Sequence, residues 1–438
     1  MNWQQLLSPM RLGMENFHDR DRDNRNQFQR DYDRLIFSAP FRRLQNKTQV
    51  FPLPGSIFVH NRLTHSLEVA SVGRSLGMNV AQAHRNENLN YLDEIGAIVS
   101  AACLAHDLGN PPFGHSGEEA IATYFSEGEG LFLKNKLIET EWCDFIRFDG
   151  NANAFRLLTH QFNGRRKGGF VLTYSTLAAI IKYPYSSLYA DEKKQKFGFF
   201  ESERSDYEKI ADELGIMRQK KNPDRFVRHP LVYLVEAADD ICYQVMDIED
   251  AHKLKILTTD ETKDLYYRFF DEKRLTKIKE NLLIVSDVNE QIAYLRSSVI
   301  GQLVEECTQA FLKNEEKIMD GNFEGSLIKN LSIQTSDAYK HCSDIALSKI
   351  YKSQEVLDIE LAGYHIIYKL MELLVNAVLN PEKTYSRQLL NRIPEQYDTK
   401  SPTIYGKVQA VLDYISGMTD VYALDLYKKI TGISISSI

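Results

Sequence analysis

The sequence predicts an all-α protein, and three observations carry this prediction. Residues 94–105 form a continuous apolar run of the length and content typical of a buried helix. Residues 260–438 contain long helical patterns with few prolines. An alternating strand pattern of any length occurs only at 432–436, so short hairpins near 48–60 and 168–173 are the most β-structure that we expect.

The beginning of the chain is expected to alternate helix and loop. Residues 15–45 have the pattern of an exposed, Arg- and Asp-rich helix that becomes amphipathic toward its end. Two prolines and a glycine between residues 48 and 61 predict a loop or a short hairpin. A helix is then expected from 64 to 85, with His65 and Glu68 about one turn apart near its start.

The apolar run must end at a break, because Pro111 and Pro112 interrupt the helical pattern that follows it. Ser116 is expected to cap the next helix. This arrangement would put His115 on the loop and Glu118 in the first turn of the new helix.

Three further helices are expected before the long C-terminal helical region. They cover 150–160, 176–182 and a segment that begins at Pro230, a residue suited to a first helical turn, and runs through Asp247. A basic, glycine-containing loop is expected at 164–169. The strongly charged residues 190–228 predict a surface insertion.

The composition limits the classes of function. Of the 438 residues, 43% are hydrophobic and 26% are charged, which is typical of a soluble globular protein. A formal net charge of -7 argues against a general polyanion binder. Residues 1–50 nevertheless carry nine Arg or Lys against six acids. This basic arm could face phosphates, or it could form a solvated helix with internal ion pairs.

The cysteines and the hydropathy pattern indicate a cytoplasmic protein. The five cysteines are odd in number and none is closely paired, which favours reduced thiols over disulfides or a zinc knuckle. The N-terminus lacks a charged-then-apolar signal pattern. The longest apolar run is too short to span a bilayer, so we expect no membrane association.

Residues 105–118 are the centre of the functional prediction. His106 and Asp107 end the apolar helix, where a charged or metal-ligating side chain is costly unless a partner satisfies it. An imidazole beside a carboxylate suits a divalent metal of intermediate softness. A lone His-Asp pair also occurs by chance, and His115 could simply cap a helix, so this stretch alone leaves the structural alternatives open.

Other polar residues on helical segments strengthen the metal hypothesis. His65 lies upstream and Asp239 lies downstream, and the order His, His-Asp, Asp resembles the signature of the HD superfamily of metal-dependent phosphohydrolases. Asp239, Tyr243 and Asp247 are spaced four apart and therefore share one helical face. Periodicity alone would make that face a solvent face, whereas the resemblance favours a polar cleft.

Longer matching segments extend the resemblance over almost the whole chain. They are residues 41–51, 62–69, 106–118, 236–241 and 413–420. With these segments the chain resembles the deoxyguanosine triphosphate triphosphohydrolase (dGTPase) family. The resemblance implies an HD-domain multi-helix bundle with a helical C-terminal extension.

The resemblance also implies a division of the chain into three parts. Residues 1–60 would form an N-terminal arm that packs on the core, and residues 61–255 would form the HD catalytic core. Residues 256–438 would form a helical region that completes the nucleotide pocket and supplies oligomer contacts.

The implied metal site consists of two imidazoles and two carboxylates, from His65, His106, Asp107 and Asp239. Such a set can leave positions open for water and a phosphate oxygen, and Mn²⁺, Mg²⁺ and Fe²⁺ all fit it. The metal would polarise a phosphoryl oxygen and help to generate or hold the attacking hydroxide.

His115 and Glu118 would be the catalytic acid/base pair. A carboxylate that is hydrogen-bonded to one ring nitrogen fixes the tautomer and raises the pKa of the imidazole. The resemblance implies attack of water at the α-phosphorus, which releases the deoxynucleoside and inorganic triphosphate in one step. His115 would either activate the water or protonate the leaving 5′-oxygen, and the sequence leaves both roles open.

Six residues are expected to bind the substrate. The resemblance assigns Arg62 to the phosphates and adds Asn110 to the set, while Lys182 is a weaker phosphate candidate for which surface solvation is an equal alternative. Gln49 and Asp247 would hydrogen-bond the 3′-hydroxyl. Tyr243 would press on the sugar where a 2′-hydroxyl would clash, which predicts deoxyribose over ribose.

The base preference, activator requirement and oligomeric state stay open at this point, although dGTP is the favoured substrate. Arg387 is a candidate for reading the base, and Asp240 either orients a metal ligand or balances a nearby arginine. Relatives use nucleotide or single-stranded DNA activators and form homo-oligomers, often hexamers. The alternatives are an HD nucleotidase or phosphodiesterase for other phosphoesters, and a catalytically inert nucleic-acid-binding scaffold.

Overall fold

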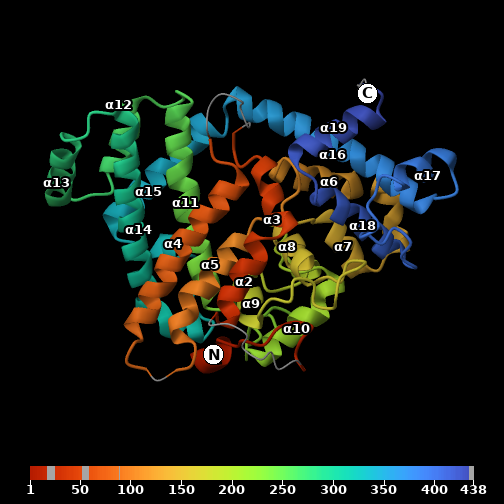
Figure 1. Ribbon diagram of the computed structural model, residues 1–438, viewed down its shortest axis with the longest axis horizontal. Helices are drawn as coiled ribbons and strands as arrows, with labels where there is room; N and C mark the ends of the chain where they lie inside the picture. Colours follow the sequence, from red (N-terminus) through yellow and green to blue (C-terminus); the bar gives the residue numbers. More distant parts are fainter. Residues whose placement is uncertain (17–24, 52–58, 88, 434–438) are drawn as a thin grey trace.

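The computed structural model describes residues 1–16, 25–51, 59–87 and 89–433, and this part of the chain is built from helices (Figure 1). Pairing between extended segments is confined there to isolated bridges, such as Thr48 with Asn61 and Arg11 with Thr173. The all-α prediction is therefore confirmed. Within the described residues, no helix combines the length and apolarity that crossing a membrane requires.

The helices of the first half of the chain have the following bounds. They are α1 (Trp3–Leu6), α2 (Gln27–Ile36), α3 (Ala39–Arg43), α4 (Arg62–Ala83), α5 (Ile95–Ala105), α6 (His115–Ser126), α7 (Glu139–Ile146), α8 (Gly150–Thr159), α9 (Tyr174–Ile180) and α10 (Arg204–Glu213). Short 3-10 turns connect several of them.

The helices of the second half are longer. They are α11 (Leu231–Lys253), α12 (Thr259–Tyr267), α13 (Glu272–Leu282), α14 (Val288–Met319), α15 (Ile333–Ile345), α16 (Gln354–Leu379), α17 (Thr384–Leu390), α18 (Ile404–Ser416) and α19 (Asp420–Ile430). A π-helical turn at Ala346–Ile350 continues α15.

Helices α4, α5 and α11 pack together at the centre of the molecule and carry the chemistry described below. Helix α5 is buried at ten of its eleven positions, as its apolar content requires. A side chain could not fit between α4 and α5 at Gly77 or Gly96, since a Cβ on Gly77 would lie 2.8 Å from the Cα of Gly96. This close approach brings His65 of α4 next to the end of α5.

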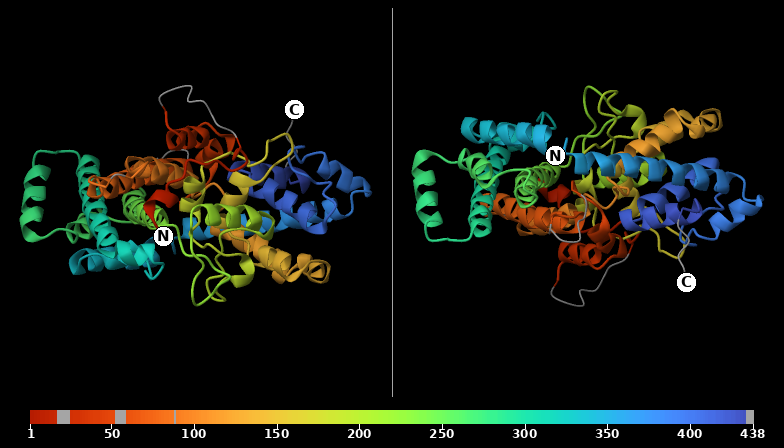
Figure 2. Two further views of the ribbon diagram at one scale, coloured as in Figure 1. Left: turned by 90° about the horizontal axis from the view of Figure 1, so that it is seen from below. Right: turned by 90° about the horizontal axis from the view of Figure 1, so that it is seen from above.

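The outer helices lie at two ends of an elongated molecule (Figures 1 and 2). Helices α12 and α13 are at one end, and α17 to α19 are at the other. The long helix α16 reaches from the central region toward the α17–α19 end and packs on α6 and α18. The three-part division into 1–60, 61–255 and 256–438 stays a prediction.

The N-terminal arm packs on α5 through α2. Arg11 and Asp31 form a buried ion pair at 2.6 Å, and Arg25 pairs with Asp33 at the surface, also at 2.6 Å. These pairs agree with the alternative of internal ion pairing for this basic segment; residues 17–24 lie outside the described part of the chain.

Several local predictions were wrong. Ser116 does not cap α6. The helix begins at His115, the residue before Ser116, and Gly114 is at the N-cap position. No hairpin forms at 168–173, where Thr173 pairs instead with Arg11 across the chain. In the 48–60 region only the Thr48–Asn61 bridge is described, and residues 52–58 and 434–436 lie outside the described part.

The segment 190–228 was predicted to be a surface insertion, and this is only partly right: residues 191–195 are exposed, but the segment also carries buried aromatic residues. Phe197, Phe199, Phe200 and Tyr207 are at most 2% exposed. Their rings stack on one another and on neighbouring aromatic residues. The high charge of the segment concealed this buried aromatic core.

Candidate active site

A cavity of about 510 Å³ lies where α4, α5, α6, α11 and the start of α16 meet. Ten of the twelve predicted site residues line it: Gln49, Arg62, His106, Asp107, Asn110, His115, Glu118, Lys182, Asp239 and Tyr243. His65 lies buried behind this wall, against Asp239. Asp247 is also set back from the cavity.

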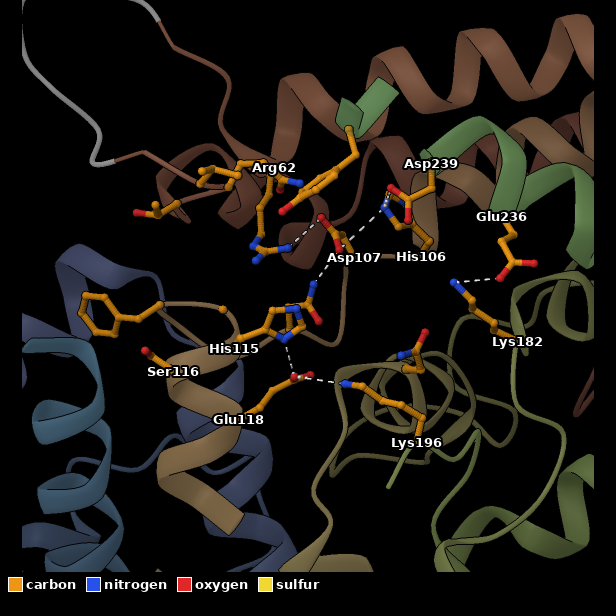
Figure 3. A pocket seen from close by; sticks show the side chains of 18 of the residues that line it. Arg62, His106, Asp107, His115, Ser116, Glu118, Lys182, Lys196, Glu236 and Asp239 are labelled. Carbon is orange, nitrogen blue, oxygen red and sulfur yellow. Dashed lines mark hydrogen bonds and ion pairs between the residues drawn. The ribbon is translucent and has the colours of Figure 1, made fainter. Parts of the chain in front are cut away.

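The four predicted metal ligands meet at one side of the cavity, where Figure 3 shows His106, Asp107 and Asp239. One ligand atom from each of His65, His106 and Asp107 lies within 4.8 Å of the others. Asp239 Oδ1 lies 3.0 Å from His65 Nε2 and 3.5 Å from His106 Nε2. Each side chain comes from or directly follows one of the three central helices, so helix packing sets these distances.

The donor set fits a divalent cation. His106 Nδ1 donates to the carbonyl oxygen of Cys103 at 2.6 Å, which turns Nε2 toward the two carboxylates. That Nε2 is buried and makes no hydrogen bond among the described residues. A buried polar atom without a partner is rare in proteins, and here it faces two acids that together with it would hold a metal.

The carboxylates of this cluster are held in their ionised form. Burial raises the pKa of Asp107, but Arg62 and the two histidines outweigh burial and bring this pKa below its usual value. The pKa of Asp239 is well below its usual range, because His106 and His65 overcome the effect of burial. Two ionised acids in a low-dielectric site require a nearby cation.

Arg62, the first residue of α4, connects the metal side of the cavity to the catalytic loop. Its Nη1 donates to Asp107 Oδ2 at 2.8 Å, and its Nε is buried without a hydrogen-bond partner among the described residues. Its Nη2 faces Gly114, where a Cβ would come within 2.7 Å. This buried guanidinium has donors free for a phosphate oxygen.

His115 and Glu118 form the predicted pair on the first turn of α6. His115 Nδ1 lies 2.9 Å from Glu118 Oε2, and Glu118 Oε1 accepts a hydrogen bond from the backbone N–H of Gly150 at 2.7 Å. The hydrogen bond between His115 and Glu118, together with the charge of Glu118, raises the pKa of His115. Burial raises the pKa of Glu118, but His115 and Lys196 lower it to about 2.

The sequence did not identify Lys196, although it lies on the cavity wall. Its Nζ lies 3.4 Å from Glu118 Oε2 and 3.4 Å from Asp149 Oδ2, so one ammonium is shared by two buried acids (Figure 3). Lys196 falls in the segment that was predicted to be a surface insertion, where a lysine carries no signal. The aromatic residues beside it would have been the only clue.

Lys182 faces the cavity but already has a partner. Its Nζ lies 3.1 Å from Glu236 Oε1, and Arg228 lies 3.1 Å from the other oxygen of the same acid. Burial lowers the pKa of Lys182, but Glu236 and Tyr183 raise it above its usual value, so the ammonium stays charged. With Arg62 and Lys196, Lys182 gives the cavity three cationic side chains.

Gln49 and Asn110 are both on the cavity wall. Gln49 Oε1 is buried without a hydrogen-bond partner among the described residues, which leaves an acceptor for a ligand hydroxyl. Asn110 instead donates to Asp107 Oδ1, so it holds a metal-binding carboxylate in place. Both side chains are positioned by segments that flank helices α4 and α5.

Tyr243 and Asp247 share a helical face as predicted, but a second tyrosine separates their roles. Tyr243 lines the cavity and stacks on Tyr351, with ring centroids 6.0 Å apart. The Tyr351 hydroxyl donates to Asp247 Oδ2 at 2.6 Å, so the buried carboxylate is occupied. The role of Asp247 as a ligand of the 3′-hydroxyl stays a prediction, and Tyr351 had no sequence signal.

Two weaker candidates do not reach the site. Arg387 lies on α17, a helix that contributes no residue to the cavity wall. Asp240 neither lines the cavity nor makes a side-chain hydrogen bond or ion pair among the described residues; burial raises its pKa to about 7, and the nearest cation is Lys182. The cations that act on Asp240 are lysines, Lys182 and Lys329, and no arginine pairs with it among the described residues; a role in orienting a metal ligand stays a prediction.

The helical fold and the His/Asp cluster define an HD-domain phosphohydrolase of the metal-dependent class. The family model of the HD domain matches residues 62–167, and that of the phosphohydrolase-associated domain matches residues 330–429. The first match contains His65, His106, Asp107, His115 and Glu118, while Asp239 lies beyond it.

Relatives of known name are similar over nearly the whole chain. The deoxyguanosinetriphosphate triphosphohydrolase-like protein of Pseudomonas aeruginosa is 38% identical, with 99% of each chain covered. The protein of the same name from Synechocystis is 38% identical over 99% of this chain and 100% of its own. The deoxyguanosinetriphosphate triphosphohydrolase of Serratia proteamaculans is 29% identical over 92% and 93%. The chain belongs to this deoxyguanosinetriphosphate triphosphohydrolase-like family.

Proposed function

We propose that the protein hydrolyses deoxynucleoside triphosphates, dGTP in particular, to the deoxynucleoside and inorganic triphosphate. The observation that carries the proposal is the single cavity that joins the His/Asp cluster, the His115–Glu118 pair and three cationic side chains. The name of the Serratia relative supports the choice of dGTP.

In the proposed reaction, a water oxygen bonds to the α-phosphorus as the bond from that phosphorus to the 5′-oxygen breaks. The leaving 5′-oxygen takes up a proton, and the attacking water loses one. His115, whose pKa is raised by its hydrogen bond to Glu118, is the group placed to move one of these protons. Which of the two it moves is a question for the pH profile.

The cationic residues of the cavity have a separate task. Phosphoryl transfer depends mainly on positioning and on stabilising the charge of the phosphate oxygens. Arg62 pairs with Asp107 through Nη1 but keeps other guanidinium donors unpaired, whereas the single ammonium of Lys182 pairs with Glu236 and that of Lys196 with Glu118 and Asp149. Arg62 is therefore the strongest phosphate contact in the proposal.

His65, His106, Asp107 and Asp239 would hold a divalent cation, Mn²⁺, Mg²⁺ or Fe²⁺. When bound, such a cation supplies Lewis-acid polarisation of a phosphate oxygen and lowers the pKa of water. Gln49 and Asp247 would bind the 3′-hydroxyl, and Tyr243 would exclude a 2′-hydroxyl. A cytoplasmic location, a homo-oligomer and activation by nucleotide or single-stranded DNA belong to the same proposal.

One product analysis tests the proposal. The protein is incubated with Mn²⁺ and each of the four dNTPs or GTP, singly and in mixtures, and the products are separated by anion exchange. Deoxynucleoside with intact triphosphate, and GTP left unchanged, is the expected result. Release of phosphate or pyrophosphate without triphosphate would assign another phosphoester activity, and turnover confined to mixtures would indicate an activator site.

A further inference from the structure

The turn between α18 and α19, residues 416–420, contacts two segments of the cavity wall that lie far away in the sequence. We call it the C-terminal turn. Asp420 is its last residue and the first residue of α19, and it is 7% exposed. Its two carboxylate oxygens bind backbone amides on two different segments.

One oxygen, Asp420 Oδ1, accepts a hydrogen bond from the backbone N–H of Phe113 at 3.0 Å. The other, Oδ2, accepts one from the backbone N–H of Thr48 at 2.7 Å. Phe113 lies two residues before His115, and Thr48 is adjacent to Gln49. A single carboxylate therefore joins the loop that precedes the proposed acid/base residue to the segment that carries a proposed sugar contact.

The loop before His115 needs such support because its backbone is in a disfavoured conformation. Phe113 has φ +62° and Gly114 has φ +56°, and a positive φ is costly for a bulky side chain such as phenylalanine. The Phe113 ring is confined by Gly363 of α16, whose absent side chain leaves the space that the ring occupies. Asp420 holds the N–H of the same residue.

The placement of the His115 ring depends on this backbone. The side chain of His115 is 89% exposed, and within the described residues its one side-chain hydrogen bond is the one with Glu118. A ring with so few contacts is positioned mainly by the backbone that carries it. A shift of the Phe113–Gly114 backbone would therefore move the ring relative to the α-phosphorus.

Other contacts of the C-terminal turn reinforce the same junction. The buried Lys47 Nζ donates to the carbonyl oxygens of Ser416, at 2.7 Å, and Asn110, at 2.6 Å. Arg43 donates to the carbonyl oxygen of Gly417 at 3.0 Å. Of the three side chains, only that of Asp420 binds backbone amides on both wall segments.

We propose that Asp420 is a positioning residue for the hydrolytic reaction: it sets the distance between the His115 loop and the Gln49 segment. This proposal rests on the proposed function. The carboxylate is suited to this task, since each of its oxygens accepts one amide and the start of α19 favours a negative charge. It touches no substrate atom in this scheme.

Asp420→Asn is the direct test, because the amide keeps the size of the carboxylate but can accept only one of the two bonds. Its NH₂ group would face a backbone N–H. We expect kcat for dGTP to fall about 10- to 100-fold, as a misplaced catalytic group requires, and the preference for dGTP over GTP to weaken. The control is Asp31→Asn, another buried acid that accepts a backbone N–H, from Thr173 at 2.9 Å; it also pairs with Arg11 and does not line the cavity.

Hydrogen–deuterium exchange of the same proteins gives a readout that does not depend on turnover. We expect the amides of Thr48 and Phe113 to be protected in the wild type and to exchange at least about tenfold faster in Asp420→Asn but not in Asp31→Asn. Unprotected amides in the wild type would overturn the proposal without any variant. So would an Asp420→Asn protein with unchanged exchange at both segments, or with kcat within twofold of wild type.

The two proposals can fail separately. If the wild type releases triphosphate from no nucleotide, the proposed function is wrong, and exchange at the two segments still decides whether Asp420 joins them. If the wild type hydrolyses dGTP while Asp420→Asn and Asp31→Asn lower stability equally and leave kcat and the sugar preference unchanged, Asp420 has a structural role alone.

Discussion

His115 and Glu118 form a hydrogen-bonded pair, with Nδ1 and Oε2 2.9 Å apart, on the first turn of a helix whose start is open to the cavity. The acid is buried and the imidazole is exposed, so Glu118 controls the proton affinity of a ring that a substrate can reach. The pH dependence of turnover is therefore the sharpest probe of this pair.

Glu118→Gln should lower the pKa of His115, because it removes the negative charge that raises this pKa. The limb of the kcat/KM profile that reports His115 then shifts to lower pH, whether the ring acts as acid or as base. If His115 is the acid the shifted limb is the alkaline one, and if it is the base the shifted limb is the acidic one. The rate should also fall about 10- to 100-fold.

Glu119→Gln is a suitable control, since it changes the same charge on the neighbouring residue of α6, which does not line the main cavity. Its profile should match that of the wild type. An unchanged profile in Glu118→Gln would show that the pair does not set the rate.

His106→Ala should abolish tight metal binding, because it removes the buried Nε2 that faces Asp107 and Asp239. We expect a loss in metal affinity of more than about 100-fold, measured as metal content after dialysis against a weak chelator. His365→Ala, which removes an exposed histidine that contacts the Tyr427 hydroxyl, should leave metal content unchanged. Equal metal in both variants would place the metal elsewhere.

Tyr243→Ala should relax the choice of sugar. The ring lines the cavity and is held by stacking on Tyr351, so its removal opens space beside the proposed sugar site. We expect kcat/KM for GTP relative to dGTP to rise about tenfold, a typical effect of removing a steric contact. Tyr351→Phe keeps the stack but releases Asp247, and it should change KM for dGTP without admitting GTP.

His60→Gln should destabilise the fold in a pH-dependent manner. Burial lowers the pKa of His60, but Asp250 and Glu68 raise it from 6.5 to about 10. A raised pKa contributes stability that is complete below about pH 6.5 and is lost as the pH rises through about 10. We expect His60→Gln to lower the free energy of unfolding by about 2 to 4 kcal/mol at pH 6 and by much less above pH 10.

Urea unfolding at the two pH values measures this difference, and His365→Gln serves as the control for the loss of a histidine without an ion pair among the described residues. An equal loss of stability at both pH values would show that packing of the ring, and not its charge, accounts for the effect.

The sequence was informative where chemistry is concentrated in a short segment. His106, Asp107, His115 and Glu118 stand in one unusual stretch, and Asp239 and Tyr243 share one helical face, but only the family resemblance made them site candidates; the structure places all six on one cavity. The buried helix α5 was equally clear, since its apolar content favours burial.

What the sequence did not reveal are contacts made between distant segments. Nothing in the sequence marks Lys196, which folding places between Glu118 and Asp149. The same is true of Tyr351, whose hydroxyl donates to Asp247. Ser116 was wrongly predicted to cap α6. The N-cap is Gly114, which has a positive φ, and the close approach of Arg62 leaves no room for a side chain there. Local patterns carry no information on such approaches.

The attachment of Asp420 to both Thr48 and Phe113 has a consequence for the order in which the protein is made. Helices α4, α5 and α11, which carry the metal-binding side chains, leave the ribosome long before α19 exists. A nascent chain can thus assemble its ligand cluster while the catalytic loop still lacks its support. Under the proposed function, full hydrolytic activity would then be reached only near the end of translation.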